Sequence, residues 1–415
     1  MLAMNAGLPR RTPLTDSAGW FTLFEEPKND IPVVNDWSMN MGKIISAGHI
    51  CLDITPVFPS GHRYDRISDL LVPGKLLRTE AAGVHTGGSV ANTGLALKIL
   101  GNDVTLLGKV GDDAFGRMVQ SIVAGCGAGG LIVDGGTSTS YTVVLAVPGI
   151  DRIFLHNPGA NDTFSASDIP EEALADAELF HFGYPTLMKR MYENSGAETR
   201  TLLRRVKAKG IATSLDLTAV DPKSDAGKAD WQAILSNLLP YVDFFVPSFE
   251  ELCYMLDRPL YDTLSAQGGD MTAQEGILQT ADRLARRCLE MGCGAALVKC
   301  GLSGMVWRAG SRERLLQAGS RLKLNVDEWA DTSGTQPCFR AETVRSATGA
   351  GDVSIAAYLT ALMDGEPPAV CVKLAAAEGA ASVSAYDPLS ALLPLQELKQ
   401  RIAEYESGGI SSISR

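Results

Sequence analysis

A run of small residues, Thr348-Gly349-Ala350-Gly351, ends in Asp352 and enters an apolar stretch that predicts a helix. Small residues let a ligand approach the backbone, and the first amides of a helix bind negative charge. Such a site would stabilise the charge on a phosphoryl group during its transfer. An aspartate beside it repels phosphate, so its useful role is to take a proton from an attacking hydroxyl. The competing interpretation is that Asp352 only caps the helix.

A second glycine-rich segment, Gly87-Gly88-Ser89-Val90-Ala91-Asn92, opens another predicted helix. The paired glycines would allow a ligand against the backbone, and Asn92 offers both a donor and an acceptor. A further segment, Gly108 to Gly116, follows along the chain. A Gly-Gly pair alone is more often a plain turn, so its weight depends on the other two segments.

The elements that must position these segments alternate along the chain from Lys43 onward. Short apolar runs that predict buried strands alternate with helical stretches, which indicates βαβ units and a mostly parallel sheet. Residues 54–86 and 138–157 break the rhythm and predict short strands of a small separate sheet. Residues 308–343 are polar and predict a surface excursion. The expected strands are 43–48, 104–107, 179–182, 212–215 and 244–246 with 295–298, and the expected helices are 91–100, 114–124, 199–209, 274–291, 351–363 and 370–383.

Composition limits the function classes. The chain has 415 residues and a formal net charge of -11, which disfavours nucleic acid as a partner. Its eight cysteines form no Cys-x-x-Cys pair, and we expect reduced thiols. No secretory signal and no apolar run long enough to span a membrane are expected, which predicts a cytoplasmic protein.

Together the segments Gly87–Asn92, Gly108–Gly116 and Thr348–Asp352 resemble the two signatures of the ribokinase-like (PfkB) carbohydrate kinases. The resemblance implies a doubly wound α/β domain over residues 41–405 with a small β-sheet lid, after an N-terminal extension of residues 1–40. Residues 406–415 would form a C-terminal tail. It also implies ATP with Mg²⁺ and transfer of the γ-phosphoryl to a substrate hydroxyl.

The resemblance assigns roles to single residues. Asp352 matches the catalytic base, and the amides of Gly349, Ala350 and Gly351 match its anion hole. The substrate-binding positions are Asp53, Gly87, Gly88 and Asn92. The expected nucleotide-binding positions are Asp216, Ser248, Lys299, Gly301, Gly304 and Thr348, and Glu251 would hold Mg²⁺ through water.

Four positions depart from the family pattern. Ser248 stands where asparagine is usual, Ser346 where aspartate precedes the glycine run, Lys299 where threonine is commoner, and Val353 where a bulkier, often aromatic residue follows the aspartate. The first departure could alter the dependence on magnesium or phosphate, and the second weakens the case for a monovalent-cation site. Neither removes the base or the anion hole.

The substrate is underdetermined by the sequence. No basic pair for a phosphorylated sugar stands out, so an unphosphorylated sugar or polyol is favoured, with a nucleoside as the alternative. A non-catalytic sugar-binding regulator also remains open because of Ser248 and Ser346. A dinucleotide-binding oxidoreductase is disfavoured, since Gly-x-Gly-x-x-Gly does not follow the first strand. By resemblance, the edge of the lid could pair with a second copy to form a homodimer.

Overall fold

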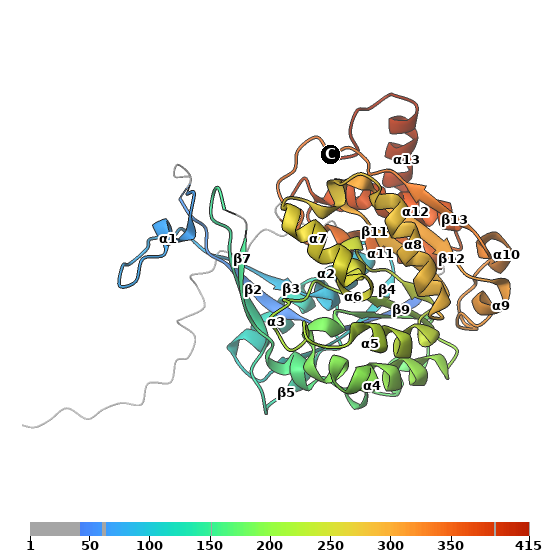
Figure 1. Ribbon diagram of the computed structural model, residues 1–415. Coiled ribbons are helices and arrows are strands. Elements are labelled where there is room, and N and C mark those ends of the chain that lie inside the picture. The colour runs from blue at the N-terminus through green and yellow to red at the C-terminus, as the bar shows by residue number, and fades with distance from the viewer. Residues whose placement is uncertain (1–41, 60–63, 151, 386, 415) are drawn as a thin grey trace, which may run out of the picture. The chain divides into compact units, whose positions relative to one another are not determined.

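The computed structural model describes residues 42–59, 64–150, 152–385 and 387–414. In these ranges a nine-stranded sheet runs in the order β13-β12-β11-β10-β9-β8-β1-β4-β5 (Figure 1). Neighbouring strands from β11 to β5 are parallel, and β12 and β13 join as antiparallel strands. The strands are β1 Lys43–Gly48, β4 Asp103–Gly111, β5 Ile132–Asp134, β8 Leu179–Gly183, β9 Ala212–Asp216, β10 Phe244–Phe245, β11 Ala295–Lys299, β12 Met305–Ala309 and β13 Ser333–Gln336.

Helices cover both faces of this sheet because side chains alternate along each strand. Ile44 and Leu106 face one buried cluster, and their neighbours Ile45 and Leu107 face the other. The helices that contribute to the first cluster are α2 Ser89–Ile99, α3 Ala114–Gly125, α9 Arg312–Leu315, α10 Val326–Trp329, α11 Ala350–Met363, α12 Pro368–Ser382 and α13 Leu395–Glu406. Those of the second are α4 Lys189–Lys207, α5 Trp231–Leu238, α6 Phe249–Leu256, α7 Arg258–Gln267 and α8 Ile277–Glu290. The fold is the doubly wound, mostly parallel sheet that the sequence predicts.

A smaller sheet has the strand order β3-β2-β6-β7. Its strands are β2 Cys51–Thr55, β3 Gly83–Gly87, β6 Tyr141–Leu145 and β7 Ile153–Asn157, and the short helix α1 Ile67–Leu70 lies between β2 and β3 in the chain. Phe58, Leu70 and Val147 form a small apolar cluster of their own. The separate sheet is confirmed, and its first strand begins at Cys51, three residues before the predicted start at residue 54.

The prediction of a surface excursion over residues 308–343 is wrong in part. The segment returns to the main sheet as β13, which pairs with β12 from Met305 opposite Gln336 to Arg308 opposite Ser333. The sequence Ser-Gly-Thr-Gln does not indicate a strand because it has little apolar or β-branched character. An edge strand can be this polar because only one of its sides is paired.

Two other differences concern helix ends and termini. Helix α4 spans Lys189–Lys207 but is interrupted by non-helical backbone at Glu193–Gly196, and the predicted helix from 199 corresponds to the part after this break. Near the C-terminus, Ile413 is fully buried and its amide donates to the carbonyl of Arg340. The predicted N-terminal extension, residues 1–40, lies outside the described residues. Among the described helices, none has the length and apolar character that crossing a membrane requires.

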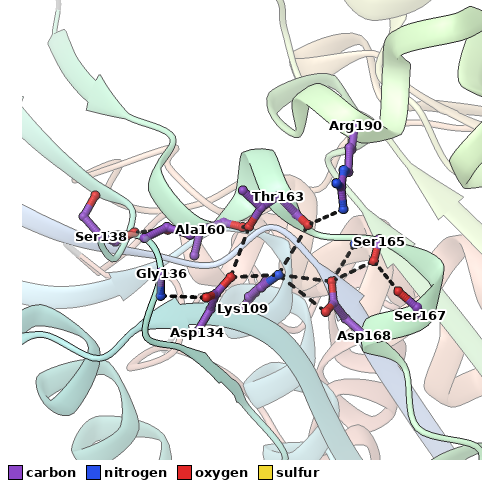
Figure 2. A network of polar contacts seen from close by, with 11 residues as sticks. Lys109, Asp134, Gly136, Ser138, Ala160, Thr163, Ser165, Ser167, Asp168 and Arg190 are labelled. Atoms are coloured by element: carbon purple, nitrogen blue, oxygen red, sulfur yellow. Dashed lines mark hydrogen bonds and ion pairs between the residues drawn. The ribbon is translucent and has the colours of Figure 1, made fainter.

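An ion cluster around the buried Lys109 side chain joins β4 to β5 and to the segment before β8 (Figure 2). The Lys109 ammonium lies 3.0 Å from Asp134 Oδ2 and 3.3 Å from Asp168 Oδ2, and it donates to the carbonyl of Thr163. We call Lys109, Asp134 and Asp168 the Lys109 cluster. Since an ammonium has three donors, each of them has an acceptor here. The cluster is therefore complete without a ligand.

Candidate active site

The side chains with chemical potential gather where parallel strands end. His49 follows β1, Tyr184 follows β8, Asp216 ends β9 and Lys299 ends β11. Strands β1, β8, β9, β10 and β11 are mutually parallel where they are neighbours, so their carboxyl ends share one edge of the sheet. Ligands of open α/β sheets bind at this edge.

Helix α11 brings Asp352 to the same edge. Its N-cap, Gly349, has φ 76°, and a Cβ at that position would lie 2.6 Å from Pro388 Cβ. Glycine is needed there for the left-handed backbone and for the close approach. Asp352 lies in the first turn with only 3% of its surface exposed. The aspartate is thus buried at the positive end of a helix.

Three side chains donate hydrogen bonds to the Asp352 carboxylate. Asn92 Nδ2 lies 3.0 Å from Oδ2, Thr93 Oγ1 lies 3.2 Å from Oδ1, and Tyr184 Oη lies 2.8 Å from Oδ1. Burial raises the pKa of Asp352, while the hydrogen bonds from Asn92 and Tyr184 and the charge of Lys299 oppose that rise. The two glycine-rich segments of the sequence therefore meet through Asn92 and Asp352.

A second group lies beside this aspartate. Lys299 Nζ donates to Asp216 Oδ1 at 2.8 Å; the Asp216 side chain is buried, and that of Lys299 is 13% exposed. Burial raises the pKa of Asp216, an effect that Lys299 opposes and Glu251 strengthens. Burial works against the charge of Lys299, but the carboxylates of Asp216 and Glu251 outweigh it and raise the pKa of Lys299. Lys299 therefore carries its charge at neutral pH. We call Lys299, Asp216, Glu251 and Asp352 the Lys299 cluster.

The Lys299 side chain extends to the start of α11. A Cβ built on Gly351 would lie 3.8 Å from Lys299 Nζ, an ordinary contact distance. The ammonium and the first amides of α11 thus lie together, and both attract an anion. The protein's own packing leaves room for a side chain at Gly351, so the glycine keeps that space open.

Ser248 and Glu251 are hydrogen-bonded to each other. They form a capping box at the start of α6: the Ser248 amide donates to Glu251 Oε2 at 2.8 Å, and the Glu251 amide donates to Ser248 Oγ at 3.3 Å. A Ser at the N-cap with Glu three residues later is a common way to begin a helix. In the described ranges no group of three or more His, Cys, Asp or Glu side chains is arranged to hold a metal ion.

The remaining predicted nucleotide positions lie in turns. Gly301 and Gly304 belong to the connection between β11 and β12, with φ 51° and 98°. Cβ atoms there would lie 2.5 Å from Thr272 Oγ1 and 2.1 Å from the Gln336 carbonyl oxygen, so the turn itself requires both glycines. Thr348 is exposed just before α11, and its amide donates to Ser346 Oγ. Their contact with a nucleotide stays a prediction.

The paired glycines lie beneath two polar side chains. A Cβ on Gly87 would lie 2.2 Å from Asp53 Oδ2, and one on Gly88 would lie 2.5 Å from His49 Nδ1. Gly88 also has φ 85° and is the N-cap of α2. Gly88 is required because its backbone is left-handed and the imidazole and the His49 carbonyl occupy the space of a side chain, while a side chain at Gly87 would displace the Asp53 carboxylate. Asp53 and His49 are thereby placed at the start of the helix that carries Asn92.

His49 is buried with neither ring nitrogen hydrogen-bonded to the described protein. Its ring centroid lies 5.4 Å from that of His156 on β7 and 6.2 Å from that of Tyr184. Burial, with the nearby His156, lowers the pKa of His49 to about 3, so the ring is neutral at pH 7. A buried polar group without a partner is costly, and such groups are frequently kept for a ligand.

The family model of the "pfkB family carbohydrate kinase" matches residues 50–394. The chain belongs to the PfkB family. That match covers both glycine-rich segments and the Lys299 cluster, which confirms the family resemblance seen in the sequence.

Individual PfkB relatives are more distant. The chain is 28% identical to maize fructokinase-1 over 149 residues, which is 35% of this chain and 42% of that protein. The match thus spans less than half the length of that relative. A fructokinase from Xylella fastidiosa with bound ATP aligns with a TM-score of 0.62 and 20% identity over 89% of this chain and 99% of its own. A putative ribokinase II from E. coli in complex with ATP and Mg²⁺ aligns with a TM-score of 0.64 and 19% identity over 88% of this chain and 100% of its own. At these identities the solved structures show the fold.

The sequence did not single out three side chains of this candidate site: His49, Thr93 and Tyr184. Two of them had a readable position, because His49 and Tyr184 directly follow strand-end glycines, Gly48 and Gly183. Their orientation toward the site depends on the tertiary fold. Thr93 adjoins Asn92, but its contact with Asp352 joins residues 259 positions apart.

Proposed function

We propose that the protein is an ATP-dependent phosphotransferase that moves the γ-phosphoryl group of ATP to a hydroxyl of a sugar or polyol. The observation that carries the proposal is the buried Asp352 carboxylate at the first turn of α11, hydrogen-bonded to Asn92 of the other glycine-rich segment. One segment offers amides for a phosphate, the other offers donors for a substrate, and the base lies between them. Family membership supports the same activity.

The chemistry follows from the charges of the site. Asp352 takes the proton of the attacking hydroxyl, and its burial strengthens it as a base by raising its pKa. The amides of Gly349, Ala350 and Gly351 face the phosphoryl group as it moves, and the Lys299 ammonium adds a positive charge beside Gly351. Closure of the small sheet over the substrate would exclude water and limit wasteful hydrolysis of ATP.

The described residues fit ATP with Mg²⁺. The Lys299 cluster holds three acidic side chains against one lysine, and a bound cation would favour their charged forms. Mg²⁺ keeps several waters and binds mainly through substrate phosphates, so it needs no cage of protein ligands. Glu251 is the residue that would hold it through water, and bound Mg²⁺ would neutralise charge on the phosphates. Asp216 and Lys299 would flank the phosphates.

The substrate side favours a neutral polyhydroxylated molecule. Asp53 can accept from two neighbouring hydroxyls, and the neutral ring of His49 offers one donor and one acceptor. Neither group attracts a phosphate, since one is an anion and the other is uncharged. Asn92 completes the set near Asp352. These residues support an unphosphorylated sugar or polyol over a sugar phosphate.

The small sheet is proposed to act as a lid and as a dimer contact. Strand β7 is one edge of that sheet, and its Phe154 and Leu155 are each 55% exposed. An exposed apolar edge strand is a template for pairing with another chain. We therefore propose a homodimer formed through the lid, which sedimentation of the wild type against a Phe154→Lys variant would test.

ADP formation over a panel of sugars, polyols and nucleosides, with Mg²⁺-ATP present, tests the proposed activity. We expect ADP release that depends on an unphosphorylated sugar or polyol and that is lost in Asp352→Asn. Sugar binding without turnover would instead indicate a regulator, and turnover with nucleosides alone would indicate a nucleoside kinase. The Asp352→Asn variant is the matched control for contaminating ATPase activity.

A further inference from the structure

Tyr184 has a backbone conformation that is unusual for its residue type. Its φ and ψ are 63° and 43°, in the left-handed region, and it precedes Pro185. A bulky residue is rarely found there, and a following proline favours extended conformations instead. The conformation is held by the Tyr184 amide, which donates to the Asp216 carbonyl, and by the Leu187 amide, which donates to the Tyr184 carbonyl. Strain of this kind is concentrated at functional sites.

The strained backbone directs the tyrosine hydroxyl to one atom of the base. Tyr184 Oη donates to Asp352 Oδ1 at 2.8 Å, and Thr93 Oγ1 donates to the same oxygen at 3.2 Å. A carboxylate oxygen has about two acceptor positions, so Oδ1 is filled. Oδ2 accepts from Asn92 alone among the described residues. One acceptor position of the base is therefore free, and it lies on Oδ2.

We propose that Tyr184 is a positioning residue that, with Thr93, occupies Oδ1 of Asp352 and so makes Oδ2 the atom that receives the substrate proton. The inference rests on the proposed function, since it concerns how the same base is oriented. Tyr184 itself takes no proton from the substrate. Its hydroxyl fixes the carboxylate plane and stabilises its charged form.

Several charged groups act on this carboxylate, and their signs determine the test. Lys299 from β11 favours the charged form of Asp352, and Asp216 from β9 opposes it. Tyr184 also lies in the field of Glu251 from α6, and α2 contributes the neutral donors Asn92 and Thr93. Loss of the Tyr184 hydroxyl removes one donor to the charged form. The pKa of Asp352 must then rise.

The test uses Tyr184→Phe, which keeps the ring, with Tyr254→Phe as the matched control. Tyr254 also donates its hydroxyl, but to the Gly227 carbonyl. In Tyr184→Phe we expect the acidic limb of kcat/KM to move up by about one pH unit, since one hydrogen bond to a charged group has roughly that effect. Activity then falls about tenfold below the limb and little above it. Tyr254→Phe should leave the limb in place.

A second measurement does not depend on turnover. The carboxyl ¹³C resonance of Asp352, assigned with Asp352→Asn, is titrated without substrate in both tyrosine variants. We expect the midpoint to rise in Tyr184→Phe alone. An unmoved limb and an unmoved midpoint would overturn the role of Tyr184, as would a shift to lower pH. Absence of phosphoryl transfer in the wild type would instead refute the proposed function, while the titration would still report on Tyr184.

Discussion

The Lys109 cluster and the Lys299 cluster place a buried lysine among carboxylates in two contrasting ways. Lys109 lies near Asp134, Asp168 and the Thr163 carbonyl, which provide acceptors for its three donors (Figure 2). Lys299 makes a single hydrogen bond to a described residue, Asp216, and its side chain lies beside Gly351 at the start of α11. All three donors of the Lys109 ammonium are used within the protein, whereas the Lys299 ammonium has donors left for a ligand.

The difference separates structural from functional use of the same residue types. A saturated buried cluster stabilises the fold, and removing one partner leaves an uncompensated charge. An unsaturated cluster at the carboxyl ends of parallel strands is costly to the fold and is maintained for a ligand. The sequence contains both lysines near glycine-rich segments, so only the contacts tell them apart. The predictions below test this distinction.

The largest effect is expected at Asp352. Asp352→Asn should lower kcat by ~10²–10⁴-fold, the usual loss when a general base is removed, with ATP binding nearly intact. Because burial raises the pKa of Asp352 in the fold, its ionisation destabilises the protein as pH rises. The difference in unfolding free energy between the variant and the wild type should therefore be more favourable to the variant at pH 8 than at pH 4. Unchanged turnover would contradict the assigned role.

The two lysines provide the direct comparison. Lys299→Met should reduce kcat by ~10²–10³-fold, similar to the loss of one transition-state donor. Its fold should suffer less, because Asp216, whose pKa burial already raises, can take up a proton. Lys109→Met should reduce the free energy of unfolding by about 1–3 kcal/mol, since its partners Asp134 and Asp168 keep part of their solvent exposure, while the folded fraction keeps its kcat. Urea unfolding and steady-state kinetics measure both variants. A loss of kcat in Lys109→Met together with a loss of stability alone in Lys299→Met would reverse the assignment of the two clusters.

His49 tests the substrate side. His49→Leu should raise KM for the sugar about tenfold or more, yet stability at pH 7 should be kept or increased by about 1 kcal/mol, because an unpaired buried polar group is removed. The folded-state pKa of about 3 lies below the ordinary value of 6.5. The free energy of unfolding of the wild type should therefore fall as pH falls below 6.5, because unfolding lets His49 take up a proton. This fall should be smaller in the variant. An unchanged KM would remove His49 from the substrate site.

The smallest effect is expected at Ser248. Since its hydroxyl caps α6, Ser248→Ala should lower the free energy of unfolding by about 1 kcal/mol. Asp230→Ala, which removes the cap of α5, is the matched control for such a loss. KM for ATP should rise only slightly in Ser248→Ala, through the freed Glu251, and should not change in the control. A severe rise would instead support direct contact between Ser248 and the nucleotide.

The sequence predicts the main strands and both site helices because their apolar runs and glycine starts are local signals. Asp352 and Asn92 could be paired in advance only through the family resemblance, since 260 positions separate them. Strand β13 was missed because its residues are polar, and Tyr184 because its left-handed backbone has no marker in a Tyr-Pro pair. That both ring nitrogens of His49 lack a hydrogen-bond partner in the described residues is likewise a property of the tertiary fold, which the sequence does not show.

A crystal structure with Mg²⁺, a non-hydrolysable ATP analogue and a turned-over sugar is the most direct test of the central claim. We expect one sugar hydroxyl within hydrogen-bond distance of Asp352 Oδ2, and the terminal phosphate against the first amides of α11 beside Lys299. A carboxylate that faces away from both ligands, or a nucleotide bound elsewhere, would contradict the account.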